Sequence, residues 1–104
     1  MKYFFVGIKG TGMSALAQVL KGLGYEVEGS DKKDHFFTEE ALIEKNIKIY
    51  EFNKDNIKED MIIVQGNAFK DTHEEIVRAK ELNIKIYSYQ DMVSKLTKMF
   101  ETIT

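Results

Sequence analysis

A glycine-rich segment near the N-terminus carries the clearest chemical signal in this sequence. Residues 7–14 read Gly-Ile-Lys-Gly-Thr-Gly-Met-Ser and directly follow the apolar run Tyr3 to Val6. Glycines between a strand and a helix allow a tight turn and a close approach of the backbone to a ligand. The free N–H groups and the positive dipole end of the following helix favour a phosphate or diphosphate. We therefore predict phosphate binding here, with a tight turn that binds no ligand as the alternative.

The spacing of the glycines separates this segment from two common nucleotide motifs. Gly7, Gly10 and Gly12 form the pattern Gly-x-x-Gly-x-Gly, whereas the dinucleotide fingerprint is Gly-x-Gly-x-x-Gly. Lys9 stands at the second glycine of that fingerprint, where we expect its side chain to crowd the pyrophosphate of NAD. A Walker P-loop needs Gly-x-x-x-x-Gly-Lys-Ser/Thr, so this segment is not an ATP-binding loop of that type.

Two later segments are candidates for the rest of a nucleotide site. Asp31 lies 19 residues after Gly12, near the usual place of an acid that binds a ribose at the end of the second strand. A solvated loop aspartate or a turn cap would also explain Asp31, and Ser30 could assist through its hydroxyl. Gly66 and Asn67 follow the second strongly apolar run, where either turn formation or ligand contact would account for them.

The residue types that perform chemistry or hold metals are sparse. The chain has no cysteine, which excludes disulfides, thiol catalysis and cysteine-based zinc sites. Its two histidines, His35 and His73, are too few and too far apart to predict a metal site. No Ser/His/Asp arrangement and no carboxylate pair is evident. The residues alone therefore predict a nucleotide-binding domain with no catalytic and no metal-binding residue.

Length and composition limit the possible classes of protein. A chain of 104 residues has room for one domain, since domains usually need roughly 100–150 residues. A hydrophobic fraction of 43% and a net charge of −2 indicate a folded globule and argue against a nucleic-acid partner. No apolar run approaches the roughly 18 residues of a membrane span, and the N-terminus is typical of a strand rather than a signal peptide. We expect no membrane partner and a cytoplasmic location.

Strand and helix patterns alternate along the chain. Strands are predicted at 3–6, 25–28, 47–50, 61–64 and 84–87, and helices at 13–22, 38–43, 72–82 and 91–100. This alternation predicts an α/β fold, a Rossmann-like doubly wound five-stranded parallel sheet with strand order 3-2-1-4-5. A small open sheet of the flavodoxin type is the alternative. The three candidate segments then meet where the winding reverses, at the carboxyl ends of the first and fourth strands.

Helix ends and faces give further expectations. Thr38 should cap its helix, and Thr72 and Glu75 should form a Thr-x-x-Glu capping box. In the last helix an apolar stripe runs through Met92, Val93, Leu96, Met99 and Phe100. We expect the first three to pack on the sheet of this domain, and the last two to face a domain that is absent from this chain.

The motifs taken together resemble the Mur ligase family. The resemblance runs through residues 7–17, 24–31, 36–38, 66–68 and 71–79, in order and at matching spacing, and so covers essentially the whole chain. Within the family the chain is similar to the N-terminal domain of ligases that add L-alanine to UDP-N-acetylmuramate. Ligases that recycle murein tripeptide have a similar domain and stay open as an alternative.

The resemblance implies a role in cytoplasmic peptidoglycan synthesis. Ligases of this kind use ATP and magnesium to activate the lactyl carboxylate of UDP-N-acetylmuramate as an acyl phosphate, which the amine of L-alanine attacks. Residues 1–104 would be the N-terminal UDP-substrate-binding domain of a larger ligase, with the central ATP-binding and C-terminal domains absent. The domain by itself would bind no cofactor and would be inactive.

Matching the family motif position by position also implies which residues bind the substrate. The diphosphate loop corresponds to Gly10, Thr11, Gly12, Met13 and Ser14. Ser30 and Asp31 match the loop on the uridine side, and Asn67 and Ala68 match the loop after the fourth strand. None of them would take part in the chemical step.

Two readings from other classes of protein remain open on the sequence. A regulatory module that senses NAD would have a similar fold and an acid after its second strand, although Lys9 in the glycine segment argues against it. A domain that only mediates protein contacts would use the glycines for packing alone.

Overall fold

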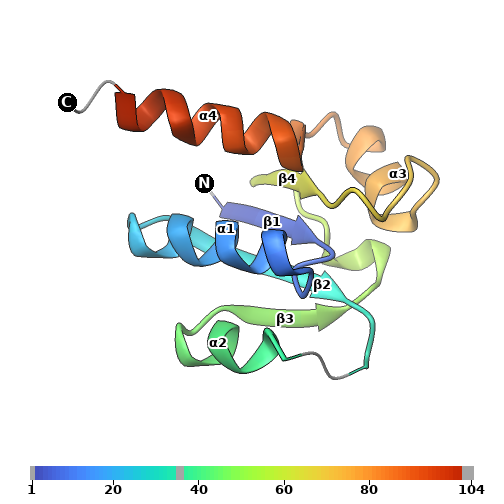
Figure 1. Ribbon diagram of the computed structural model, residues 1–104. Coiled ribbons are helices and arrows are strands. Elements are labelled where there is room, and N and C mark those ends of the chain that lie inside the picture. The colour runs from blue at the N-terminus through green and yellow to red at the C-terminus, as the bar shows by residue number, and fades with distance from the viewer. Residues whose placement is uncertain (1, 35–36, 102–104) are drawn as a thin grey trace.

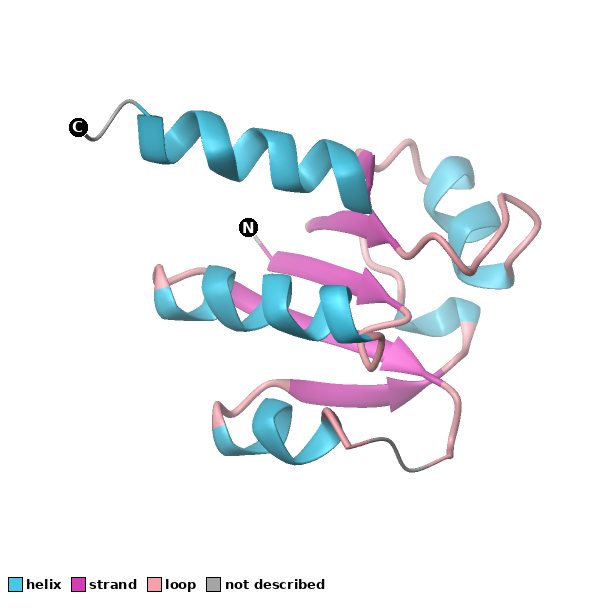
Figure 2. Ribbon diagram, in the orientation of Figure 1, coloured by secondary structure: helices cyan, strands magenta, loops and turns pink. Residues whose placement is uncertain are grey.

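The computed structural model describes residues 2–34 and 37–101, with the side chains of residues 99–101 excepted. The described chain forms a parallel sheet covered by helices on both faces (Figures 1 and 2). In chain order the elements are β1 (Lys2–Val6), α1 (Thr11–Gly22), β2 (Glu26–Asp31), α2 (Glu39–Glu44), β3 (Lys48–Glu51), the 3₁₀ turn η1 (Lys54–Asn56), β4 (Met61–Gln65), α3 (Glu74–Glu81), β5 (Ile86–Ser88) and α4 (Tyr89–Glu101).

The strand order confirms the predicted doubly wound topology. The five strands lie in the order β3-β2-β1-β4-β5, and every pairing is parallel. The two most apolar strands, β1 and β4, pair with each other near the centre, with Val6 opposite Gln65. Their continuous apolar character is explained by burial on both faces, because Phe4 and Phe5 point to opposite sides and both are fully buried.

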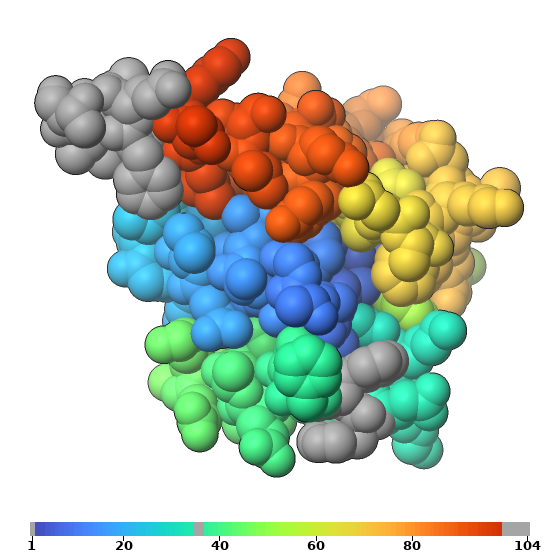
Figure 3. Space-filling model, viewed as in Figure 1, coloured from blue at the N-terminus to red at the C-terminus, as the bar shows by residue number. Residues whose placement is uncertain are grey.

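One face of the sheet is covered by α1, α2 and α4. Their apolar side chains join Tyr3 and Phe5 of β1 in one core cluster, and in the space-filling view α4, in orange and red, lies directly against α1, in blue (Figure 3). Met92 and Leu96 of α4 are buried there, as predicted. The same prediction for Val93 is wrong, since its side chain is 37% exposed one residue further around the helix. The side chains of residues 99 and 100 lie outside the described residues, so their expected role stays a prediction.

The opposite face is covered by α3 and by the segment around η1. Ile57, Ile76 and Ala79 pack there against Phe4 and Val6 of β1. The crossover from β1 to β2 through α1 and the crossover from β4 to β5 through α3 lie on opposite faces of the sheet. The loops after β1 and β4 therefore diverge at the same edge of the sheet. That edge is where a ligand cleft is expected in a doubly wound fold.

The start of α3 differs from the predicted capping box. The N-cap residue is His73, whose Nδ1 accepts a hydrogen bond of 3.1 Å from the N–H of Glu75. Glu75 is fully buried, and its carboxylate bonds residues on other elements rather than the backbone N–H of Thr72. A histidine nitrogen thus performs the capping that the sequence pattern assigned to the Thr72 hydroxyl.

The sequence predicted no membrane-spanning segment, and the length and apolar character of the helices bear on that prediction. In the described part of the chain, no helix combines the length and the apolar character that crossing a membrane would need.

Candidate functional site

A cleft of about 460 Å³ opens at the carboxyl edge of the sheet. It lies between the glycine segment after β1, the end of β2, the loop after β4 and the start of α4. The lining residues are Gly7, Gly10, Gly12, Met13, Asp31, Lys32, Gly66, Asn67, Ala68, Phe69 and Tyr89. The cleft therefore occupies the place that the predicted topology assigned to a ligand, where the winding of the sheet reverses.

The N-terminus of α1 forms one wall of this cleft. Gly10 is the N-cap, with an extended backbone at φ −60° and ψ 146°, and the first intrahelical hydrogen bond runs from Ser14 N–H to the Gly10 carbonyl at 2.8 Å. The N–H groups of Thr11, Gly12 and Met13 precede that bond, so they are available to an external acceptor. The first turn of α1 contains no acidic residue. This wall can therefore bind an anion through N–H groups and the helix dipole.

Asp31 ties the glycine segment to the end of β2. Its carboxylate accepts the N–H of Lys9 at 2.8 Å and the N–H of Lys32 at 2.7 Å, and the residue is only 6% exposed. A carboxylate offers about four lone-pair sites, so two remain for a ligand. Asp31 lines the cleft and can accept hydrogen bonds from sugar hydroxyls while it holds the loop.

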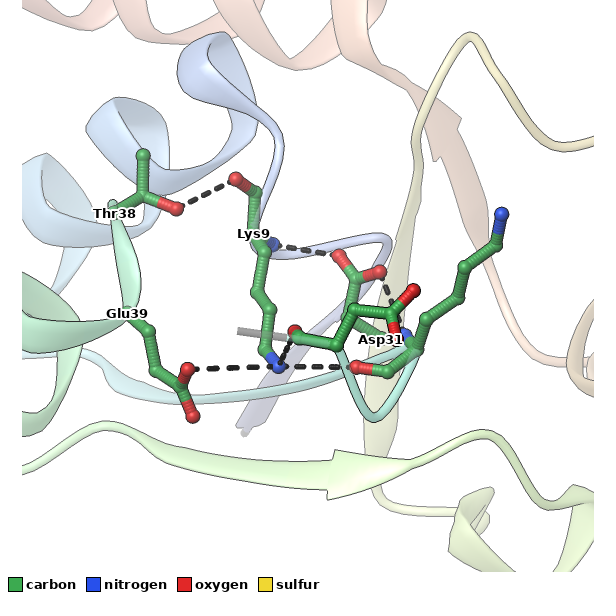
Figure 4. A network of polar contacts seen from close by, with 6 residues as sticks. Lys9, Asp31, Thr38 and Glu39 are labelled. Atoms are coloured by element: carbon green, nitrogen blue, oxygen red, sulfur yellow. Dashed lines mark hydrogen bonds and ion pairs between the residues drawn. The ribbon is translucent and has the colours of Figure 1, made fainter. Parts of the chain in front are cut away.

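Lys9 has a different role from the one its position in the motif predicted. Its ammonium donates to the carbonyl oxygens of Lys32 at 3.0 Å and Asp34 at 2.8 Å, and it lies 3.8 Å from the Glu39 carboxylate (Figure 4). The side chain is 4% exposed and is not part of the cleft lining. The prediction that it crowds a pyrophosphate is therefore wrong, and Lys9 no longer argues against a dinucleotide.

Thr38 belongs to the same polar network. Its hydroxyl donates to the carbonyl oxygen of Lys9 at 2.6 Å (Figure 4), and it makes no side-chain capping bond to α2. Thr38 therefore holds the predicted N-cap position of α2, but its hydroxyl is engaged across the fold and does not cap the helix. Together, Lys9, Asp31 and Thr38 fix the glycine segment against the loop after β2.

Ser30 lies behind the cleft rather than in it. Alternation along β2 turns its side chain to the face covered by α3, where it is fully buried and its hydroxyl donates to the Glu75 carboxylate. The prediction that its hydroxyl contacts a ligand is corrected by this burial. The carbonyl oxygen of Ser30 accepts the N–H groups of Gly7 at 2.9 Å and Ile8 at 3.1 Å, so Ser30 supports the glycine segment from behind.

The nine predicted binding residues separate into two groups in the described structure. Six of them line the cleft, namely Gly10, Gly12, Met13, Asp31, Asn67 and Ala68. Thr11, Ser14 and Ser30 do not. The Ser14 hydroxyl donates to the Thr11 carbonyl at 3.1 Å inside α1, and Thr11 is exposed at the start of that helix, where its N–H remains available.

The structure also places residues in the cleft that the sequence did not single out for binding. Phe69 lies against Gly7, whose φ of +88° suits glycine and where a Cβ would come within 2.1 Å of the phenylalanine ring. The ring of Phe69 packs in turn against Phe52 and His73. Tyr89 enters from α4, far along the chain. Only the glycine at the end of β1 carried a local signal, because the other contacts depend on the tertiary fold.

The loop after β4 is fastened at its base. The Gln65 side-chain amide donates to the Phe69 carbonyl at 2.9 Å and to the Asp71 carboxylate at 3.2 Å. The pKa of Asp71 is lowered from its ordinary value, chiefly by the hydrogen bond from Gln65 and then by Lys80, whose ammonium lies 3.4 Å away. These contacts position Asn67 and Ala68 at the mouth of the cleft.

The acidic and histidine side chains do not gather into a metal-binding cluster in the described part of the chain. Across residues 2–34 and 37–101, no three His, Cys, Asp or Glu side chains are grouped so that they could hold a metal ion. The cleft itself presents N–H groups, the Asp31 carboxylate, the Lys32 ammonium, the polar side chains of Asn67 and Tyr89, and apolar side chains.

The fold and the cleft together define a class. A doubly wound parallel sheet, with a helix N-terminus and an acid at its switch point, has the architecture of α/β domains that bind nucleotides. The sequence model of the Mur ligase family, catalytic domain, matches residues 2–101. The chain belongs to the Mur ligase family.

Solved structures of longer ligase chains contain a closely similar domain. UDP-N-acetylmuramate-alanine ligase MurC from Thermotoga maritima matches with a TM-score of 0.86 and 29% identity, over 95% of this chain and 23% of that one. The UDP-N-acetylmuramate:L-alanyl-gamma-D-glutamyl-meso-diaminopimelate ligase from Neisseria meningitides matches with a TM-score of 0.81 and 28% identity, over 90% of this chain and 30% of that one. A murein peptide ligase from Psychrobacter arcticus matches with a TM-score of 0.84 and 26% identity, over 91% of this chain and 20% of that one. The chain thus spans less than a third of the length of each of these relatives.

Proposed function

We propose that this chain is the N-terminal domain that holds the UDP part of UDP-N-acetylmuramate in a cytoplasmic ATP-dependent ligase. That ligase would add L-alanine during synthesis of peptidoglycan precursors. The observation that carries the proposal is the cleft at the switch point, walled by the free N–H groups of α1. The similarity to the Thermotoga maritima alanine ligase supports the choice of substrate.

In this proposal each wall of the cleft binds one part of the nucleotide. The N–H groups of Thr11, Gly12 and Met13 donate hydrogen bonds to the diphosphate oxygens at the N-terminus of α1. Asp31, with two lone-pair sites free, binds ribose hydroxyls, and the loop at Asn67 and Ala68 closes the opposite side. ATP and magnesium would supply carboxylate activation elsewhere in the ligase, because residues 7–14 do not form a P-loop.

A second candidate is the ligase that recycles murein tripeptide. The Neisseria and Psychrobacter relatives match this chain nearly as well as the alanine ligase does. The two candidates share the UDP-sugar substrate, so the N-terminal domain does not distinguish them. The parent ligase should be assayed with L-alanine and with L-alanyl-γ-D-glutamyl-meso-diaminopimelate. The proposal expects phosphate release with L-alanine only, and release with the tripeptide only would favour the recycling enzyme.

Ligand binding can be tested on the chain itself. In an NMR titration with UDP, UDP-N-acetylmuramate or NAD, we expect the two UDP compounds to shift the amides of Gly10 to Met13 and of Asn67. We expect NAD to shift them negligibly, because the ligases that this chain resembles are named for UDP-N-acetylmuramate. Affinity should be weak, since the rest of the ligase is not there to complete the cleft. Strong NAD binding without any response to UDP would instead support an NAD-sensing module.

The place of the diphosphate can be tested by filling the space at Gly12. Gly12→Val should crowd the N-terminus of α1 and displace the Tyr89 side chain, whose hydroxyl lies 2.9 Å from the Cβ position. A phosphate could then not approach this terminus, and UDP binding should be lost. Gly22→Val at the other end of the same helix is the matched control, because a Cβ there meets nothing within 4 Å. A folded Gly12→Val variant that binds UDP as well as the parent would show that the diphosphate lies elsewhere.

The division of labour within the ligase gives a catalytic test. The chain alone, with UDP-N-acetylmuramate, L-alanine, ATP and magnesium, should release no phosphate above the rate of a boiled sample. Release that depends on all the substrates would contradict the proposal that catalysis needs the other domains.

A further inference from the structure

Tyr89 and Gly12 form a contact that neither the motif nor the family resemblance assigns. A Cβ built on Gly12 would lie 2.9 Å from the Tyr89 hydroxyl oxygen and 3.0 Å from the ring carbon that carries it. Positive φ angles among the described glycines are found at Gly7 and Gly24, so the backbone at Gly12 does not require glycine. The missing side chain at Gly12 makes room for the phenol of Tyr89.

The ring of Tyr89 is anchored while its hydroxyl reaches the helix terminus. Tyr89 is the first residue of α4 and is half-buried against the core cluster beneath α1 and α4. Its side chain also lines the cleft. Because Gly12 is the second residue of α1, the hydroxyl lies beside the N–H groups that precede the first intrahelical hydrogen bond. A phenol can donate one further hydrogen bond to a ligand held there.

The charged groups that line the cleft leave a diphosphate dependent on neutral hydrogen-bond donors such as this hydroxyl. Among the described lining residues, Asp31 supplies the one carboxylate and Lys32 the one ammonium. Their formal charges cancel, and Lys9 directs its ammonium to the loop after β2 instead. A diphosphate in this cleft would thus be bound mainly by neutral donors, which are the N–H groups of α1 and the hydroxyl of Tyr89.

We propose that the Tyr89 hydroxyl donates a hydrogen bond to the diphosphate and makes the cleft selective for nucleoside diphosphates over nucleosides. This inference rests on the proposed function and names a specificity-determining residue of that same site. Gly12 contributes indirectly, since its lack of a side chain admits the phenol.

The test compares Tyr89→Phe with Tyr87→Phe in titrations of the purified chain with UDP and with uridine. Tyr87→Phe is a matched control, because its hydroxyl accepts from Lys95 at 3.3 Å and its ring packs against the same core cluster. The free energy of a hydrogen bond to a charged group corresponds to a change in affinity of about tenfold or more. We expect Tyr89→Phe to weaken UDP binding by about tenfold and to leave uridine binding unchanged. Tyr87→Phe should leave both unchanged, and amide spectra will show that both variants fold.

The possible failures are distinguishable. If the wild-type chain binds UDP and Tyr89→Phe binds it equally well, the hydroxyl makes no such bond and the inference is overturned, while the proposed function stands. An equal loss for UDP and uridine also overturns it, because the hydroxyl would then not act on the phosphates. A wild-type chain that shows no response to UDP overturns the proposed function, and this inference with it.

Discussion

The buried pair Ser30 and Glu75 allows a stability prediction with a magnitude. Glu75 is fully buried, and its carboxylate accepts from the Ser30 hydroxyl, from Asn56 Nδ2 at 2.9 Å and from the Asn53 N–H at 3.2 Å. A buried carboxylate is tolerated only when such donors replace water. The change Ser30→Ala removes one of these donors without introducing a new polar group.

The expected loss follows from the charge of the acceptor. A hydrogen bond to a charged group contributes about 1.5–3 kcal/mol, so Ser30→Ala should lower the free energy of unfolding by about 2 kcal/mol. For a domain of roughly 100 residues this corresponds to a fall in Tm of roughly 8–16 °C. Urea denaturation and calorimetry at fixed pH would measure both quantities.

The control is another buried serine with a neutral partner. Ser14 is 3% exposed, and its hydroxyl donates to the Thr11 carbonyl at 3.1 Å. Ser14→Ala should cost less than about 1 kcal/mol, because the lost bond is neutral and alanine favours the helix. In a Glu75→Gln background the cost of Ser30→Ala should fall toward the same value. If Ser30→Ala costs no more than Ser14→Ala in the wild type, the argument from the buried charge is refuted.

Three further predictions concern β2, the loop after it and the loop after β4. Gly29→Ala should lower the free energy of unfolding by about 2–3 kcal/mol, since its Cβ would lie 2.6 Å from the Ile8 side chain. Gly22→Ala, with open space around it, should be neutral or stabilising in the same urea titration, and equal effects would contradict the packing argument. Lys9→Met keeps the aliphatic chain but loses the ammonium, so amide hydrogen exchange after β2 should accelerate; unchanged exchange would show that the ammonium does not hold that loop. The pKa of Asp71 is depressed below its ordinary value of 3.8, so the stabilisation that it gives is present above that value and is lost as the pH falls through the lower, folded-state pKa. NMR between about pH 5 and pH 2.5 should show this loss at the loop after β4, and a variant Asp71→Asn that shows the same pH response would disprove the assignment.

Local patterns were sufficient for the topology. The apolar runs 3–6 and 61–64 predicted central strands because only a strand covered on both faces needs apolar residues in succession. Alternating strands and amphipathic helices then left few arrangements once right-handed crossovers were required. The spacing of Gly7, Gly10 and Gly12 predicted the tight turn from β1 into α1, since such a turn depends on neighbouring residues.

Only the tertiary structure decided which side chains face the cleft. Period-two alternation places the side chains of Ser30 and Asp31 on opposite faces of β2, yet the sequence does not show that Glu75, 45 residues further on, receives the Ser30 hydroxyl. The fold of the loop after β2 directed the Lys9 ammonium away from the place its motif position suggested.

The contribution of α4 to the cleft shows the same distinction between local and distant contacts. The sequence predicted a helix there and the burial of Met92, Val93 and Leu96, because their spacing places them on one helical face. Met92 and Leu96 are buried, and Val93 is exposed. Tyr89 had no such signal, since its role depends on a contact with Gly12 across 77 residues of chain. The sequence by itself determined the strands, the helices and the glycine turn, which are governed by local propensity and periodicity. The donors that meet a ligand were decided by distant segments packing together, and no local pattern records that packing.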